Sequence, residues 1–207
     1  MTDTAKTTIS LRPMGLDDIP TVAEWFWTFQ DIAFFDRDLP VPVNVDAVRE
    51  SWRSALEFAN PPRALWFVAE NSSKTSIAIC GLQAINYVHG DAVLAVFVTE
   101  PMRGKGLARA MAVVLADLAF DQMRLNRLST FYRDDHSATQ RILVDRIGFQ
   151  KEGCKRQAWY ADGIHRDVIQ VGLLSQEWRD QRDQVKTDLE LSGMVSIDLK
   201  RTPQQGP

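Results

Sequence analysis

The stretch VFVTEPMRGKGLARAM, from Val96 to Met111, decides the fold. It starts in an apolar run, crosses a short loop and continues into apolar residues at helical spacing, which predicts a strand, a loop and a helix. The first amides of such a helix lack intrahelical partners, and the helix dipole adds partial positive charge there. Gly104 and Gly106 would let an anion approach the backbone, and Arg103 and Lys105 would offset its charge, so the loop predicts a phosphate site.

The alternative interpretation of this loop is a tight strand-to-helix turn whose cations only face water. Two common phosphate loops do not fit the sequence. The spacing Gly-x-x-x-x-Gly-Lys-Ser/Thr of nucleotide-triphosphate loops is absent, and Arg109 stands where the dinucleotide fingerprint requires its third glycine. A different class of phosphate ligand is therefore expected.

The remaining pattern predicts the order β-α-α-β-β-β-α-β-α-β-β, which is a mixed α/β (α+β) domain. The strands are expected at residues 9–13, 64–70, 76–85, 92–98, 127–132, 153–160 and 167–174. The helices are expected at residues 15–29, from Asn44 or Asp46 to about Phe58, at 104–123 and at 137–148. The run 92–98 is continuously apolar, as is typical of a strand that is buried on both faces.

The composition suits one domain with an appendage. The chain has 207 residues, of which 45% are hydrophobic, and residues 1–178 carry the whole α/β pattern. Residues 179–207 are densely charged and end in KRTPQQGP. They are expected to form a C-terminal extension that is solvated and partly disordered, with an exposed helix and an edge strand; a homodimer contact is the alternative.

Charge, cysteines and apolar runs exclude several classes of protein. The net charge of -3 argues against a general nucleic-acid binder. Cys80 and Cys154 stand far apart, outside any metal-ligand spacing, so buried thiols and no metal are expected. Two cysteines and no secretory signal favour the cytoplasm, and no run of 18 apolar residues would span a membrane.

The loop and the strand order together resemble the GNAT acyltransferases. Their signature, Arg/Gln-x-x-Gly-x-Gly/Ala after the fourth strand, is matched in full by residues 103–108. The resemblance covers Ile9 to Trp178, and the final hairpin is most similar to the RimJ/RimL-like and spermidine acetyltransferase branches. It implies a single domain with a mixed, mostly antiparallel central sheet, splayed between strands 4 and 5, and with helices on both faces.

The resemblance also implies a ligand, acetyl-CoA, as the co-substrate. Its pyrophosphate is expected on the backbone of Arg103, Gly104, Lys105, Gly106, Leu107 and Ala108. Its pantetheine arm is expected along the backbone of Phe97 and Val98. His136 or Ser137 stands where many members of the family carry an asparagine that contacts this arm.

The expected reaction is direct attack of a primary amine on the thioester in a ternary complex. The amine must first lose a proton, which costs about 4–5 kcal/mol at pH 7 for an alkyl amine. The N–H of Val98 is expected to stabilise the oxyanion. Glu70, Asp91, His89, Glu100 and His136 are the candidate bases, and a water chain is the alternative to all of them.

The resemblance fails at the general acid. The family's tyrosine, which protonates the leaving thiolate, falls at Leu143 or Val144, and neither can donate a proton. Tyr132, Tyr160 or solvent would have to replace it. This departure keeps a rival open, namely a catalytically weak acyl-CoA-binding module with a regulatory or interaction role.

The acceptor is expected to be the amine of a small molecule, a peptide or a protein. The resemblance places it beside the first two helices and the last hairpin, where Tyr160 stands. The loop between those helices combines aromatic rings with carboxylates, which suits a cationic amine, although a solvated loop is the alternative. The residues concerned are Asp31, Phe34, Phe35, Asp36 and Asp38.

Overall fold

The computed structural model describes residues 7–26, 44–57, 59–161, 163–191 and 195–199. Its strands are β1 (Thr7–Pro13), β2 (Leu65–Glu70), β3 (Ser76–Asn86), β4 (Asp91–Val98), β5 (Arg127–Arg133), β6 (Gln150–Ala161), β7 (Ile164–Leu174) and β8 (Val195–Leu199). Its α-helices are α1 (Ile19–Glu24), α3 (Val45–Ala55), α4 (Leu107–Asp117), α5 (Ser137–Gln140) and α6 (Ser175–Leu191). Short 3-10 turns stand at Leu16–Asp18 and Glu100–Met102, and π-helical turns extend α4 over Leu118–Gln122 and α5 over Arg141–Ile147.

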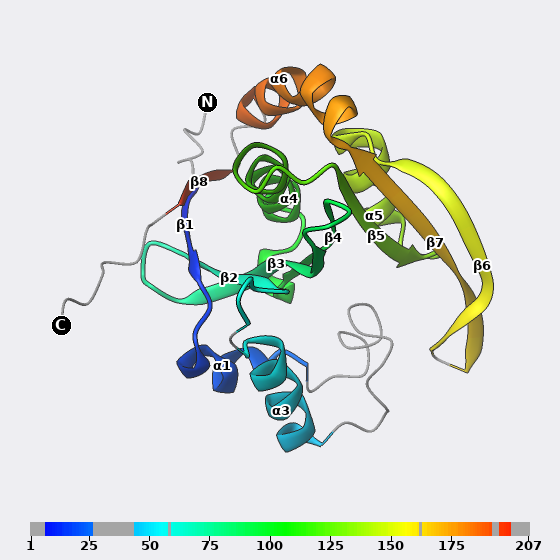
Figure 1. Cartoon of the computed structure of the whole chain (residues 1–207). Coiled ribbons are helices and arrows are strands. Elements are labelled where there is room, and N and C mark those ends of the chain that lie inside the picture. The colour runs from blue at the N-terminus through cyan, green and yellow to red at the C-terminus, as the bar shows by residue number, and fades with distance from the viewer. Residues whose placement is uncertain (1–6, 27–43, 58, 162, 192–194, 200–207) are drawn as a thin grey trace, which may run out of the picture.

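One sheet of eight strands organises the molecule, in the order β6-β7-β5-β4-β3-β2-β1-β8 (Figure 1). Neighbouring strands run antiparallel except for the two parallel pairs, β4 with β5 and β1 with β8. Helices cover both faces: α4, α5 and α6 lie on one face, and α1 and α3 lie on the other (Figure 1). The predicted fold class, a mixed and mostly antiparallel sheet between helices, is confirmed.

The sheet opens between its two central strands. The parallel register joins β4 to β5 only from Asp91–Arg127 to Val93–Ser129. Among the described residues, the later part of β4 therefore has no partner on β5, although it stays paired with β3 as far as Val98. This is the predicted splay, and it leaves backbone groups of β4 exposed toward a gap.

Two hydrophobic clusters fill the space between the sheet and its helices. The larger cluster lies under α4, α5 and α6 and contains the fully buried Leu107, Met111 and Trp178. The second cluster lies under α1 and α3 and contains Phe26 and Trp52. Successive side chains of a strand point to opposite faces, so β4 contributes to both clusters, as its continuous apolar run predicts.

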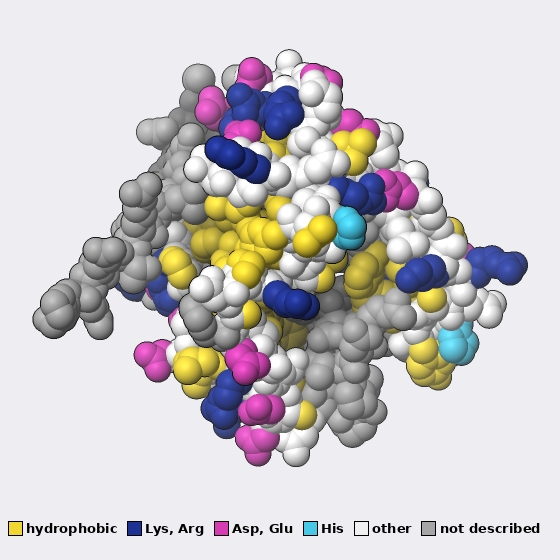
Figure 2. Space-filling view, in the orientation of Figure 1, with side chains coloured by type: hydrophobic (Ala, Val, Ile, Leu, Met, Phe, Trp, Pro, Cys, Tyr) yellow, Lys and Arg dark blue, Asp and Glu magenta, His cyan; other side chains and the backbone are white. Residues whose placement is uncertain are grey.

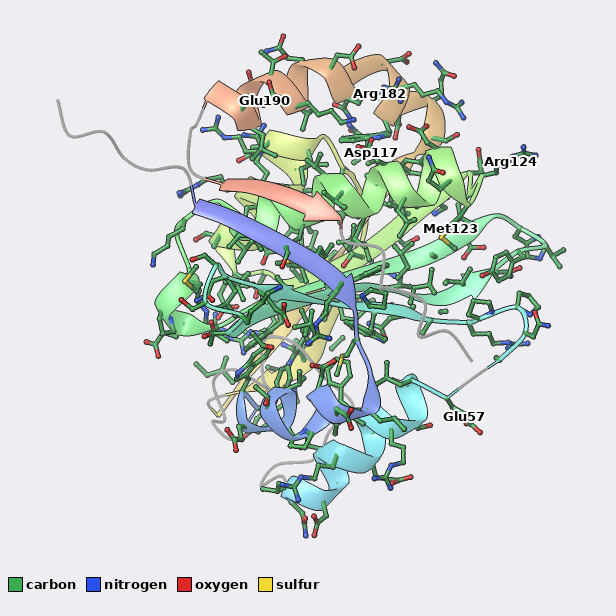
Figure 3. The ribbon with its side chains drawn as sticks, turned by 90° about the vertical axis from the view of Figure 1, so that its left-hand side faces the viewer. Glu57, Asp117, Met123, Arg124, Arg182 and Glu190 are labelled. Atoms are coloured by element: carbon green, nitrogen blue, oxygen red, sulfur yellow. The ribbon has the colours of Figure 1, made fainter. Side chains whose placement is uncertain are left out.

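Helix α6 and strand β8, which belong to the C-terminal segment, both pack onto the domain. Helix α6 runs through residue 178 without interruption, and Trp178 and Val185 are buried in the large cluster. Figure 3 shows α6 above α4 and β8 beside β1 at the edge of the sheet. The dense charges of this segment predicted a solvated extension. A few apolar residues at wide spacing are nevertheless enough to attach a helix to the core.

Two predicted helices are shorter than expected. Helix α1 ends at Glu24, and the remainder of the predicted helix 15–29 lies partly outside the described residues. Helix α4 begins at Leu107 rather than at residue 104, because Gly104 and Gly106 have φ angles of 77° and 79° and cannot belong to a right-handed helix. Helix α3 begins where Asn44 accepts a hydrogen bond from the Asp46 N–H, as its sequence predicts.

Candidate active site

The glycine loop between β4 and α4 has the geometry of an anion site. Gly106 is the N-cap of α4 and provides no side-chain cap, so the first amides of the helix are left to external partners. Gly104 also has a left-handed φ, and a Cβ built there would meet nothing within 4 Å among the described residues. The backbone is thus accessible to a ligand at Gly104.

The two cationic side chains of this loop, Arg103 and Lys105, make different contacts. The Nζ of Lys105 is exposed and lies 3.7 Å from the Met102 sulfur. The Nε of Arg103 donates to the Val98 carbonyl at 3.1 Å, and its guanidinium lies 5.8 Å from the centre of the Phe97 ring. Arg103 therefore fixes the loop against the end of β4 as well as adding charge.

The backbone of β4 alternates between its two edges. The Thr99 N–H donates to Ile77 of β3 at 3.1 Å, so the peptide groups of Phe97 face β3 as well. Those of Val96 and Val98 face the gap instead. The expectation that Phe97 pairs with the pantetheine arm is wrong for this reason, whereas the one for Val98 is compatible with the geometry.

A cavity of about 540 Å³ occupies the gap and continues onto both faces of the sheet. Its walls on the α4 side include Ala108, Ala112, His136 and Leu143. On the other side its lining residues are Phe26, Ser51, Trp52, Ala55, Trp66, Gln83, Phe131 and Trp159. On the face of the molecule that Figure 2 shows, hydrophobic side chains gather at the centre, between the helices at the top and α3 at the bottom.

Tyr132 lies in this cavity, on β5. Its side chain is only 3% exposed, and its hydroxyl has no hydrogen-bond partner among the described residues. Burial, with a smaller effect of Asp145, raises the pKa of Tyr132, so the phenol keeps its proton at neutral pH. If the register of β4 and β5 is continued, Tyr132 stands level with Val96.

Of the neighbouring residues His136 and Ser137, only His136 lines the cavity. His136 caps α5 and lines the cavity, and its Nδ1 lies 2.7 Å from the Thr139 hydroxyl oxygen. Burial lowers the pKa of His136, against an opposing effect of Asp135, so the ring is neutral at pH 7. Ser137 is exposed and does not line the cavity.

Of the two alternatives for the missing tyrosine, Leu143 is the residue that borders the cavity. Val144 packs partly buried against the large cluster instead. The position is therefore apolar within the site, and Tyr132 approaches the same cavity from β5.

Two candidate bases lie away from the cavity. Glu70 accepts a hydrogen bond from the Arg12 Nε at 2.7 Å and lies 3.6 Å from Lys74, so it belongs to a partly buried ion-pair network. Asp91 is the first residue of β4, at the closed end of the gap and paired with Arg127. Neither lines the cavity. The structure does not bring either candidate to the cavity, because sequence position alone did not show which end of the strands opens.

The predicted acceptor residues are only partly described. Phe34, Phe35, Asp36 and Asp38 lie outside the described residues. Tyr160 is 63% exposed, packs against His165 at a ring distance of 4.9 Å and does not line the cavity. Its neighbour Trp159, which is 5% exposed, lines the cavity instead. Sequence reasoning missed Trp159, and the alternation of side chains along β6 was the signal that could have indicated it.

An opened sheet with a glycine loop at the start of the following helix defines the GNAT class of acetyltransferase fold. The chain belongs to the GNAT acetyltransferase family, since the acetyltransferase (GNAT) domain matches residues 8–150.

Named relatives are found among both sequences and structures. YdaF of Bacillus subtilis (strain 168), which bears the name ribosomal N-acetyltransferase, is 29% identical over 108 residues, which make up 51% of this chain and 58% of YdaF. Protein p20 of Bacillus licheniformis, an N-acetyltransferase by name, is 24% identical over 82% of this chain and 94% of p20. The spermidine N-acetyltransferase of Vibrio cholerae, solved with CoA and spermine, superposes with a TM-score of 0.72 at 19% identity over 83% of this chain and 98% of its own.

The described residues contain neither a membrane-spanning helix nor a cluster of metal ligands. None of their helices combines the length and the apolar character that crossing a bilayer requires. Within the same residues, no group of three or more histidine, cysteine, aspartate or glutamate side chains is arranged to hold a metal ion.

Proposed function

We propose that the protein transfers an acetyl group from acetyl-CoA to a primary amine by direct attack in a ternary complex. The cavity through the gap between β4 and β5 is the observation that carries this proposal. It adjoins α4 on one face and α3 on the other, so two substrates can enter from opposite sides and meet between the strands. Membership of the GNAT family supports the same reaction.

The glycine loop would bind the pyrophosphate of CoA. The uncapped amides of α4 and the partial charge of the helix attract an anion, and the open space at Gly104 admits it. Lys105 would add a point charge at the surface, while Arg103 holds the loop against Val98. The exposed backbone edge of β4 would then carry the pantetheine arm.

The oxyanion would be stabilised by a backbone N–H of β4. Val96 and Val98 both direct their N–H toward the gap, but only Val96 lines the cavity, as Tyr132 does. We therefore assign this role to Val96 in place of Val98, which lies beyond the lining at the end of the strand. One such donor contributes about 3 kcal/mol to transition-state stabilisation.

The proton transfers would use the two titratable side chains of the cavity. The amine nitrogen attacks the thioester carbon and gives up a proton, which neutral His136 can accept directly or through water. The carbon–sulfur bond then breaks, and Tyr132 donates its proton to the departing thiolate. Solvent returns a proton to Tyr132 and removes one from His136.

We also propose a cytoplasmic location. Cys80 and Cys154 are free thiols, and a reducing compartment would keep them so.

The release of free thiol from acetyl-CoA in the presence of primary amines tests the reaction. Acetyl-CoA alone should also stabilise the fold by about 2.7 kcal/mol at 100 times its Kd, which corresponds to a rise in Tm of about 5–11 °C. Stabilisation without thiol release across a broad amine panel would support the rival, an acyl-CoA-binding module. Absence of both effects would refute the assignment of the loop as well.

A further inference from the structure

Aromatic side chains form two walls on the α3 side of the cavity. The first wall consists of Phe26, Trp52 and Trp66, with ring-centre distances of 6.1 Å from Phe26 to Trp52 and 4.8 Å from Trp52 to Trp66. The second wall consists of Phe131 and Trp159, whose ring centres are 6.1 Å apart. Phe131 is 39% exposed although it is a large hydrophobic residue on a strand. The other four rings border the cavity with at most 7% of their surface exposed, so Phe131 is the ring that the fold leaves most uncovered.

The first wall depends on a close approach of two strands. A Cβ at Gly81 of β3 would lie 2.6 Å from Cε3 of Trp66. Only glycine lets the indole lie against β3 at this place, because real Cβ atoms do not approach other atoms so closely. The position of the Trp66 ring in the cavity is thus determined by the sequence of the neighbouring strand.

The cavity carries no formal charge on its described lining. Tyr132 and His136 are its only titratable side chains there, and both are neutral at pH 7 because burial raises the pKa of Tyr132 and lowers that of His136. The remaining polar lining side chains, Ser51, Gln83, Thr130 and Thr139, are uncharged. An ammonium group placed between the aromatic walls would lose hydration without gaining a carboxylate partner from these residues.

We infer that the acceptor is a monoamine whose reacting nitrogen is attached to an apolar chain or ring, held between the two aromatic walls. This inference rests on the proposed acetyl transfer and names its acceptor class. It differs from the expectation of a cationic amine, which rested on the aromatic and acidic loop at residues 31–38 and stays a prediction, because those residues lie outside the described ones. Aromatic and aliphatic groups gain from burial between such rings, whereas a second ammonium group would lose hydration that no carboxylate of the described lining compensates.

The first experiment compares two amines of equal length, heptylamine and 1,6-diaminohexane. The second compound replaces the terminal methyl group of the first with an ammonium group. We expect kcat/KM for heptylamine, measured by thiol release from acetyl-CoA, to exceed that for 1,6-diaminohexane at least tenfold. Equal values, or a preference for the diamine, would overturn the inference while leaving the proposed transfer intact.

A second experiment places the ligand on the walls with matched variants of α3. Ser51 and Ser54 are both exposed on this helix, but only Ser51 lines the cavity. We expect Ser51→Trp to raise KM for heptylamine at least tenfold and to leave acetyl-CoA binding within twofold. Ser54→Trp should change neither quantity, and an equal effect of both variants would refute the placement.

Two further measurements separate the remaining explanations. Calorimetric titration of heptylamine into the CoA-saturated protein gives binding without turnover. The unmodified protein could bind heptylamine without releasing thiol, and Ser51→Trp could abolish that binding. This outcome would refute the proposed acetyl transfer but support the apolar binding site. If Ser51→Trp impairs turnover of hexanoyl-CoA and leaves KM for heptylamine unchanged, the walls hold the acyl chain, and the acceptor assignment is wrong.

Discussion

Replacement of Tyr132 by phenylalanine separates a chemical role from a structural one, because the two roles predict effects of opposite sign on stability. The hydroxyl of Tyr132 is buried and unpartnered among the described residues, so it contributes no hydrogen bond to folding that the structure shows. Burying an unsatisfied polar group costs about 1–3 kcal/mol. Tyr132→Phe should therefore leave the free energy of unfolding unchanged or raise it by up to that amount, with Tm rising by about 2–4 °C for each kcal/mol.

The same substitution should slow the chemistry. A positioned general acid contributes about 10²–10⁴-fold to rate, so single-turnover thiol release at pH 7 should fall at least about 100-fold. Acetyl-CoA binding, measured as a thermal shift, should stay within a few fold. A variant that is more stable, that binds the co-substrate and that is slow would have lost a proton donor rather than a packing contact.

Tyr87→Phe is the matched control. The Tyr87 hydroxyl donates to the Pro62 carbonyl at 2.9 Å, away from the cavity lining. Its removal should cost about 0.5–1.5 kcal/mol of stability and leave the rate unchanged. Retention of more than a third of the activity in Tyr132→Phe, or a clear loss of its stability, would show that Tyr132 is not the acid.

Substitutions at three further positions test the loop, the histidine and the apolar slot at Leu143. Gly104→Asp should weaken acetyl-CoA binding at least tenfold at low salt. Gly104→Asn should weaken it much less, because asparagine tolerates the same left-handed φ and carries no charge. Equal losses of affinity in the two variants would indicate an effect on the backbone only. The lowered pKa of His136 means that the unfolded state binds a proton on this ring more readily than the folded state does, so this group reduces stability as pH falls below about 6.5. His136→Asn should therefore flatten the decline of Tm between about pH 7 and 5. A decline of unchanged slope in that variant would contradict the buried, neutral state of the ring. Leu143→Ala should lower the free energy of unfolding by about 2 kcal/mol in urea titration, at the low end for a buried leucine because Leu143 already borders a cavity.

Local sequence was enough to predict the elements that position the cofactor loop. The change from a continuous apolar run to helical spacing marks β4 and α4, and the two glycines between them occupy left-handed positions that other residues rarely adopt. The turn from Asn71 to Lys74 and the helix start at Asn44 are likewise set by side chains that bond to nearby backbone. Each of these features depends on residues within a few positions of one another, which is why a linear pattern reveals them.

The chemistry of the cavity was decided by tertiary structure. Trp52, Trp66, Phe131 and Trp159 come from four separate elements, and they meet only because the sheet order brings β2, β5 and β6 around one gap.

Long-range strand pairing also decided the surroundings of Glu70 and Tyr132. Glu70 was a reasonable candidate base by composition, yet the antiparallel pairing of β1 with β2 places it beside Arg12, where it forms an ion pair. Tyr132 had no distinguishing sequence signal, and its burial without a partner arises from the opening of β4 from β5. Sequence thus determined where backbone groups would bind an anion, whereas long-range strand pairing determined which side chains face the reacting atoms, because contacts between distant residues depend on register and not on local conformation.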